Sequence, residues 1–276
     1  MYPQTHNANQ EFPAPEPVTA DIRLGAGSIA VTAEDRPFAM VTVDPYDNTE
    51  ASRQAAEHTE VELLGAKLRI EVPQTAGRIF RRDGQVRINL RIPLDSLVRA
   101  HVGSADIRTE GRLAEVVVQT GSGDTYVTQI TGLFKADTGS GDVRADQVGQ
   151  MRVSTASGDV SATLVTGDAQ IKTASGKIEI EDARGAVQAN AASGAVAIRA
   201  ARGASVNIRT ASGDALVGVP AGTRVWLDLS TASGKTTSEL AMTDTPTEAA
   251  QLNVQVRTAS GDITLRRTGE PAPAVV

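Results

Sequence analysis

The chain has 276 residues, a net charge of −6 and few aromatic side chains: four Phe, three Tyr and one Trp. The negative charge disfavours nucleic acid or an anionic membrane as the main partner, and the shortage of aromatic side chains indicates a narrow, aliphatic core. Because there is no cysteine, disulfides, thiolate nucleophiles and cysteine-based zinc sites are excluded.

The first segment, residues 1–17, is polar and contains Pro13, Pro15 and Pro17, a composition typical of a disordered arm. The chain does not open with a basic region and an apolar run, so we expect no secretory signal. No stretch approaches the length of apolar sequence that a transmembrane helix needs. We therefore expect a cytoplasmic protein with no membrane insertion.

Residues 18–100 have β character but only a weak repeat. Candidate strands lie in DIRLGAGSIAV, MVTV, KLRIEVP and QVRINLRIP, and residues 52–58 could form a brief helix or a loop. RIPLDSLVRAHVGSAD (91–106) resembles VPAGTRVWLDLSTASG (219–234), since each has a proline corner, a strand and a Gly-Ser or Ser-Gly corner. We interpret this third of the chain as irregular coils that continue into the regular array and cap its first edge.

Residues 101–268 repeat one turn phrase, written TASGDV in one of its copies. The serine of each phrase marks its position, and we call this series of serines the serine ruler. The differences in residue number between successive serines are 18, 18, 17, 18, 18, 19, 21 and 27. The serines are Ser104, Ser122, Ser140, Ser157, Ser175, Ser193, Ser212, Ser233 and Ser260. A near-constant period of this kind indicates a stacked array of coils. The long last interval predicts an extruded loop at 238–250, and residues 269–276 form a charged, proline-containing tail.

The strand before each turn alternates between apolar and polar residues, which indicates one buried face. Predicted inward side chains include Met151, Val153 and Thr155; Ala169, Ile171 and Thr173; Val206, Ile208 and Thr210; Leu227, Leu229 and Thr231; and Val254, Val256 and Thr258. A period of about 18 residues leaves no room for a covering helix, so each strand must pair in parallel with its equivalent one coil on.

The sequence therefore predicts an all-β fold, a single-stranded parallel β-solenoid (β-helix) with about 18 residues per coil. We expect a right-handed coil because parallel crossovers usually have that hand, although a left-handed triangular helix also fits the period. One solenoid domain would cover residues 18–268, with irregular coils at 18–100 and regular coils at 101–268.

One group of residues could carry chemistry. Asp106, Asp124, Asp142 and Asp159 occupy equivalent turn positions on consecutive coils, where stacked carboxylates would repel one another and a calcium ion would relieve the repulsion. The row continues with Lys177 and Ala195, so the ladder is irregular. Aspartate also suits a turn by accepting backbone N–H groups, and we favour that structural role. We expect no catalytic residue, no cofactor and no metal.

The arrangement resembles the bacterial putative-adhesin β-strand-repeat family, a domain of unknown function. The resemblance rests on the T-[AG]-S-G-D-[VI] phrase at its 18-residue spacing, on GAGSIAV (25–31), on RIPLDS (91–96) and on VGSADI (102–107), and it covers residues 18–266. It implies a β-solenoid with a non-enzymatic role. The family has no established catalytic residues, so none are transferred to this chain.

Three functions are compatible with these features. We expect a non-catalytic interaction or scaffold protein that binds another protein or a cell-envelope macromolecule through flat polar sheet faces. The outward positions hold few aromatic residues, so we expect no stacking platform for sugars or bases. The alternatives are a self-assembling structural rod and, less expected, a polysaccharide-active enzyme. We expect a monomer, with end-to-end or edge association as the alternative.

Overall fold

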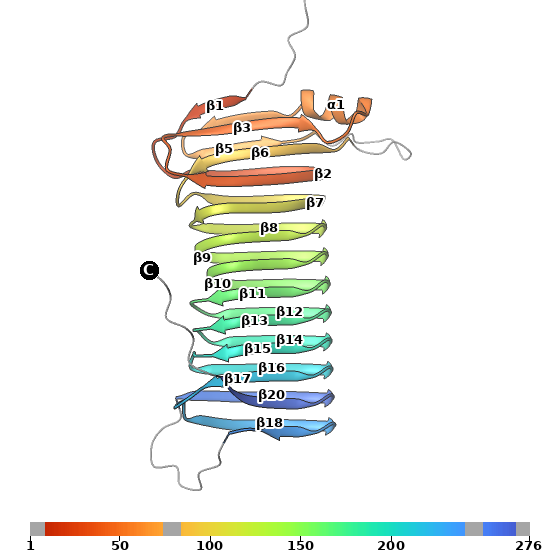
Figure 1. The fold of residues 1–276 in the computed structure, drawn as a ribbon. Coiled ribbons are helices and arrows are strands. Elements are labelled where there is room, and N and C mark those ends of the chain that lie inside the picture. The colour runs from red at the N-terminus through yellow and green to blue at the C-terminus, as the bar shows by residue number, and fades with distance from the viewer. Residues whose placement is uncertain (1–8, 74–83, 241–250, 269–276) are drawn as a thin grey trace, which may run out of the picture. The chain divides into compact units, whose positions relative to one another are not determined.

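The computed structural model describes residues 9–73, 84–240 and 251–268, and these residues form strands with one short helix (Figure 1). They group into two compact units, within residues 1–144 and 145–276. The prediction of one solenoid domain over 18–268 stays a prediction. No helix among the described residues is both long and apolar enough to cross a membrane.

The first unit is a mixed sheet built around β2. Strand β2 pairs in parallel with β5 and β6 along one edge and with β7 along the other, so that Ile29 lies between Ile88 and Ile107. Parallel pairing continues from β7 to β8 and β9. The elements are β1 (Gln10–Pro13), β2 (Thr19–Glu34), β3 (Phe38–Pro45), α1 (Glu50–Glu57), β4 (Glu60–Leu64), β5 (Lys67–Glu71), β6 (Val86–Pro93), β7 (Leu97–Leu113), β8 (Glu115–Ser122) and β9 (Thr125–Ser140).

Antiparallel pairs in this unit correct the prediction of a parallel β-solenoid, whose irregular coils were expected at 18–100. Strands β1 and β3, β3 and β6, and β4 and β5 all pair in antiparallel fashion. The connection between β4 and β5 is only two residues long and contains Gly65 at φ +61°. A turn this short can only join antiparallel neighbours. Helix α1 covers most of the segment for which a helix or a loop was expected.

The predicted disordered arm is also partly wrong. Residues 10–13 form β1, which pairs with β3 so that Gln10 lies opposite Val41. The edge of β3 offers unpaired backbone groups, and an extended segment satisfies them even though it ends in a proline. Ala14 and Val18 just beyond β1 are buried. Residues 1–8 of the predicted arm lie outside the described residues.

The second unit is a stack of parallel coils with two strands in each. One set of strands pairs in the register Val153, Ile171, Ala189, Ile208, and the other in the register Ala162, Ile180, Ile198, Val217. These side chains are all buried, which confirms the predicted parallel pairing and the inward columns. The elements are β10 (Val143–Ser157), β11 (Val160–Val165), β12 (Ala169–Ser175), β13 (Ile178–Ala183), β14 (Val187–Ser193), β15 (Val196–Ala201), β16 (Ser205–Ser212), β17 (Ala215–Pro220), β18 (Val225–Ser233), β19 (Thr236–Ser238), β20 (Leu252–Ser260) and β21 (Ile263–Thr268).

The glycine of the turn phrase is required by two constraints at once. Gly176 and Gly194 have backbone φ angles of +142° and +139°. Residues that carry a side chain rarely adopt this backbone conformation. A Cβ atom built on Gly194 would lie 2.0 Å from the carbonyl oxygen of Gly176 in the preceding coil. The coils therefore stack closely only where each corner lacks a side chain.

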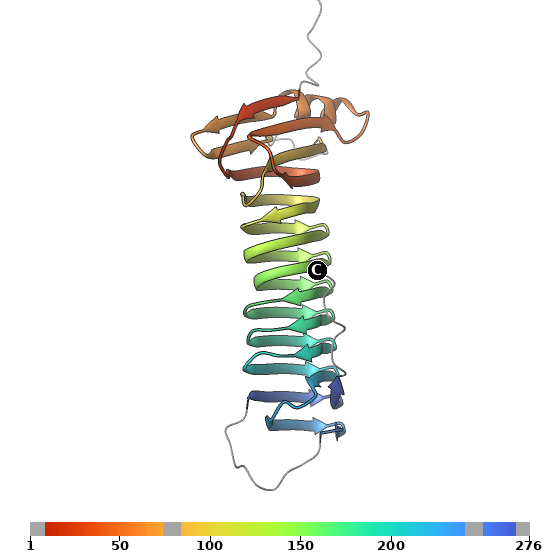
Figure 2. The same cartoon turned by 60° about the vertical axis from the view of Figure 1, so that its left-hand side comes forward.

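The last two coils do not follow sequence order. Strand β20 lies between β16 and β18 (Figure 1, Figure 2). Strand β21 pairs with β17 and β19. The serine ruler therefore runs Ser212, Ser260, Ser233 in space. The corner hydrogen bonds have the same order, since the amide of Asp262 donates to Asp214 Oδ1 at 2.8 Å and the amide of Lys235 donates to Asp262 Oδ1 at 2.7 Å.

The side chains of the two coils explain this order. At the inward positions of β21, Ile263 and Leu265 are fully buried, whereas the equivalent positions of β19 hold Thr236 and Ser238. Burial between two neighbouring coils stabilises the aliphatic side chains of β21 more than it would stabilise the polar side chains of β19. Among the described residues β18 pairs only with β20, so Leu227 and Leu229, predicted to be inward, are only partly buried. Residues 241–250 of the predicted loop lie outside the described residues, as does the tail.

A cysteine cross-link tests the strand order. The double variant Arg209→Cys/Arg257→Cys places thiols on directly paired residues, and we expect a disulfide on oxidation because neighbouring strands lie about 4.8 Å apart. The control Arg209→Cys/Ser230→Cys places them two strands apart, roughly 10 Å, and should stay reduced. The chain has no other cysteine, so mass spectrometry gives the answer directly. A cross-link in the control alone would contradict the order.

Substitution of a corner glycine tests the stacking constraint. We expect Gly194→Ala to lower the free energy of unfolding by about 2 kcal/mol or more, because strain and the clash with the preceding coil add. Urea titration measures the change. Gly25→Ala is the control, since a Cβ there meets no atom within 4 Å, and its effect should stay within about 1 kcal/mol. Equal losses in the two variants would contradict the constraint.

Candidate functional site

The charged side chains on the outward face of β13 and β15 pair with one another. Glu179 accepts a hydrogen bond from Arg199 Nε at 2.9 Å, one coil on, and Asp182 accepts one from Arg202 Nε at 2.9 Å. Lys177 also pairs with Glu179. The hydrogen bonds from Lys177 and Arg199 lower the pKa of Glu179 below its ordinary value of 4.5. These ion pairs connect neighbouring coils and leave few charges free for a ligand.

The opposite set of strands has a different outward surface, which we call the amide face. Its central column follows the strand pairing across six strands, β10, β12, β14, β16, β20 and β18, and consists of Arg152, Gln170, Gln188, Asn207, Gln255 and Asp228. Four of these side chains are amides at equivalent positions of successive coils. The face therefore repeats a hydrogen-bonding group at the strand spacing of about 4.8 Å.

Part of this column is joined by hydrogen bonds. Asn207 Nδ2 donates to Gln255 Oε1 at 2.7 Å, and Gln255 Nε2 donates to Asp228 Oδ2 at 2.7 Å. The donation from Gln255, together with that from Arg257, lowers the pKa of Asp228 below its ordinary value. Asn207 Oδ1 has no partner among the described residues although it is buried. The column thus ends in the carboxylate of Asp228, which these hydrogen bonds hold in place. The side-chain oxygen of Asn207 accepts no hydrogen bond from a described residue.

A second column on the amide face is cationic. Lys172, Arg209 and Arg257 lie at equivalent positions of their strands, and Asn190 lies between the first two. Arg257 Nη2 lies 3.3 Å from Asp228 Oδ2. Lys172, Arg209 and the Arg152 of the central column are exposed. No carboxylate in the described part of the chain forms an ion pair with any of these three, so the face carries free positive charge on a chain of net charge −6.

Two adjoining depressions run along this face. One, of about 510 Å³, is lined by residues of β10, β12, β14 and β16, among them Arg152, Gln170 and Gln188. The other, of about 490 Å³, is lined by residues of β16, β20 and β18, including Asn253 and Trp226. Both are lined by Ser205 and Asn207, so they adjoin, and we call the two together the groove.

Trp226 lies at the β18 end of the groove and is 54% exposed. It is the only tryptophan of the chain and lies directly opposite Asn253 in the strand pairing. Few aromatic residues were expected on the outer faces, and Trp226 is an exposed one. The alternation that puts Leu227 and Leu229 inward already puts Trp226 outward, and that signal was available in the sequence.

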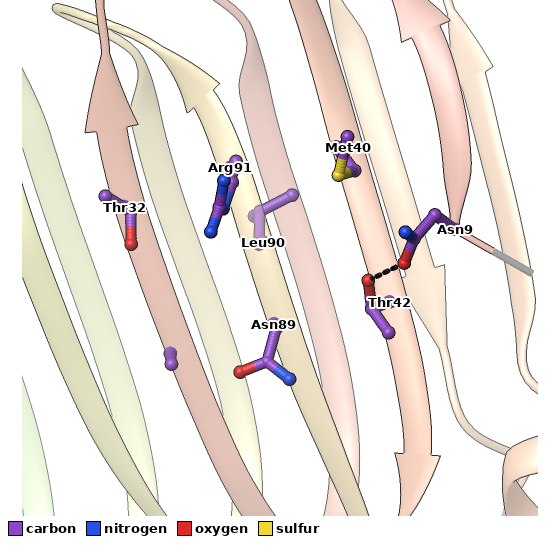
Figure 3. A pocket seen from close by; sticks show the side chains of 8 residues that line it. Asn9, Thr32, Met40, Thr42, Asn89, Leu90 and Arg91 are labelled. Atoms are coloured by element: carbon purple, nitrogen blue, oxygen red, sulfur yellow. Dashed lines mark hydrogen bonds between the residues drawn. The ribbon is translucent and has the colours of Figure 1, made fainter. Parts of the chain in front are cut away.

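The first unit has a separate depression of about 520 Å³ on its own outward face, lined by side chains of β2, β3 and β6 and by Asn9 (Figure 3). Thr42 Oγ1 donates to Asn9 Oδ1 at 2.6 Å, and Arg91 supplies the one cationic group of the lining. Antiparallel pairing of β3 with β6 interrupts the columns here. The lining lacks the repeated amides and the aromatic ring of the amide face.

The turn aspartates have a structural role. Asp106 Oδ1 accepts a hydrogen bond from the amide of Asp124 at 3.0 Å, and Asp124 Oδ1 accepts one from Asp142 at 2.8 Å. Asp159 Oδ1 likewise accepts one from the amide of Lys177 at 2.7 Å. Each of these carboxylates binds a backbone N–H one coil on. In the described part of the chain, no group of three or more His, Asp or Glu side chains is placed to hold a metal ion.

Comparison with known proteins gives a family and a fold. The family model Toastrack DUF4097 matches residues 22–266, and no curated protein matches the chain. A solved structure from Parabacteroides distasonis, described as a putative lipid binding protein, has 13% identity and a TM-score of 0.50, with 96% of this chain and 98% of that chain covered. A putative adhesin from Bacteroides fragilis has 14% identity and a TM-score of 0.46, with 96% and 99% covered.

The ion pairs of Glu179 predict a pH dependence of stability. Because its pKa is lowered in the folded chain, Glu179 stabilises the fold above pH 4.5, and this contribution is lost as the pH falls below that value. Glu179→Gln should lower the free energy of unfolding by about 0.5 kcal/mol at pH 7, and the difference should shrink towards pH 3. Denaturation at both pH values measures it.

The control is Glu239→Gln, because the exposed carboxylate of Glu239 forms no ion pair with another described residue. Its effect should be small at both pH values. A loss in Glu179→Gln that grows as the solution becomes more acidic would contradict the assignment.

Proposed function

This chain belongs to the Toastrack DUF4097 family, and we propose that it is a non-catalytic interaction protein that binds another macromolecule through the polar outer faces of its sheets. One observation carries the proposal: the amide face presents a row of amide and cationic side chains on rigid, hydrogen-bonded strands, and Arg152, Lys172 and Arg209 have no carboxylate partner within the described part of the chain. Rigid presentation lowers the entropic cost of binding.

The way in which the acidic side chains are bound argues against an enzyme. The acidic side chains on β13 are neutralised by Lys177, Arg199 and Arg202, and paired carboxylates of this kind are poor general acids or bases near neutral pH. The turn aspartates Asp106, Asp124 and Asp159 bind backbone amides. We therefore propose a role without catalysis.

Self-assembly is the second candidate, because β18 has an open backbone edge among the described residues, and open edges can pair with other chains. The polar side chains of Thr236 and Ser238 on the same coil favour a monomer instead. Light scattering distinguishes the two, since a compact monomer is expected and filaments would favour assembly. A right-handed coil and a cytoplasmic location are further parts of the proposal, and cell fractionation tests the second.

A capture experiment tests the main proposal. The purified chain, immobilised, should retain at least one specific macromolecule from native lysate. The variant Lys172→Glu/Arg209→Glu should retain at least tenfold less, since reversed charge on a contact surface costs several kcal/mol. The control Lys235→Glu/Arg266→Glu makes the same change of charge at two exposed residues outside the two columns of the amide face and should behave like the parent chain. Equal capture by both variants would contradict a role for the amide face.

A further inference from the structure

We propose that the groove of the amide face binds an extended acidic polysaccharide, with Trp226 stacking on one sugar ring. Arg152 in the groove and the cationic column beside it would bind the acidic groups. This inference rests on the proposed function and specifies the ligand class. The groove runs across β10, β12, β14, β16, β20 and β18, so a linear ligand would lie perpendicular to the strands.

Trp226 supplies the stacking surface. Trp226 is 54% exposed and lines the groove beside Asn253 and Gln255, and an exposed aromatic ring is stabilised when its apolar face is covered. A sugar ring presents C–H groups on one face and hydroxyl groups around its edge. Stacking on Trp226 would therefore bring the hydroxyl groups to Asn253 and Gln255, which line the same depression.

The amides match the hydroxyl groups of a sugar. An amide side chain offers both donors and an acceptor, and a hydroxyl group does the same, so either orientation makes hydrogen bonds. The amides of Gln170, Gln188 and Asn207 recur once per coil at about 4.8 Å, which is close to the rise of one sugar in an extended polysaccharide.

The charges favour an acidic polysaccharide over a neutral one. Arg152, Lys172 and Arg209 are exposed, and no ion pair joins them to a described carboxylate. Arg257 is already bound to Asp228 and serves to fix that end of the column. Arginine binds carboxylate and sulfate groups with two parallel hydrogen bonds. A chain with acidic groups at intervals would satisfy all three free cations without any change in the protein.

Single-stranded nucleic acid is the other anionic ligand with stacking rings. Proteins that bind it stack successive bases on several aromatic side chains, whereas the groove has Trp226 alone. The net charge of −6 also opposes a polyanion as dense as nucleic acid. The spaced charges of an acidic polysaccharide fit the three separated cations better.

Fluorescence titration tests the proposal, because Trp226 is the only tryptophan and its emission reports on the groove directly. The probes are fragments of alginate, hyaluronan and polygalacturonate, with neutral dextran fragments and a single-stranded oligonucleotide as comparisons. At least one acidic polysaccharide should shift the emission to shorter wavelength, with an affinity that falls as salt increases. Dextran should bind at least tenfold more weakly.

Variants show whether the contacts are those proposed. By calorimetry, Trp226→Ala should weaken binding about tenfold, the usual cost of removing one stacked ring. Lys172→Gln/Arg209→Gln should weaken it by a similar factor, about tenfold. The control Lys235→Gln/Arg266→Gln changes two exposed cations that line neither depression and should bind like the parent chain. Unchanged melting temperatures would show that each variant is folded.

Two results would overturn the inference. One is the absence of binding by all three acidic polysaccharides at about 1 mM, or binding that neither Trp226→Ala nor Lys172→Gln/Arg209→Gln weakens. The other is tighter binding of the oligonucleotide than of any polysaccharide. If lysate capture still depends on Lys172 and Arg209 while no polysaccharide binds, the proposed function stands and only the ligand class is wrong.

Discussion

The close approach of one coil to the next at the turn glycines is the constraint on which the rest of the structure depends. At Gly194 the carbonyl oxygen of the preceding coil occupies the space that a Cβ atom would need, and the backbone angle is one that glycine tolerates best. Only with this contact can each strand pair with its equivalent one coil on. The inward aliphatic columns and the outward amide column both follow from that register.

The regular coils could be predicted from the sequence because a period-2 pattern and a fixed turn phrase point to the same register. Val153, Ile171 and Ile208 are buried in one column as expected. The antiparallel pairs near the N-terminus were missed because parallel coils were extended beyond the repeat. The two-residue turn at Gly65 is the local feature that indicates an antiparallel pair in place of a parallel coil.

The position of the last coils and the candidate site were harder to predict. Spacing along the chain places Ser233 before Ser260, and only the polar side chains of Thr236 and Ser238 indicate which coil belongs at the end. The amide column needs the same spatial order, because Gln255 lies between Asn207 and Asp228. Trp226 was readable as an outward residue, but its place beside Asn253 depends on the pairing of β18 with β20.

The insertion of β20 between β16 and β18 has a consequence for biosynthesis. A ribosome releases β18 and β19 before β20 and β21, so the partner that β16 requires emerges after the strand that lies farther away. The turn phrases of the two coils are the same from Thr231 to Gly234 and from Thr258 to Gly261, so the earlier coil can occupy the vacant edge in a competing register. Native pairing is complete only after translation has passed Thr268, which makes the pairing of these coils a late step of folding.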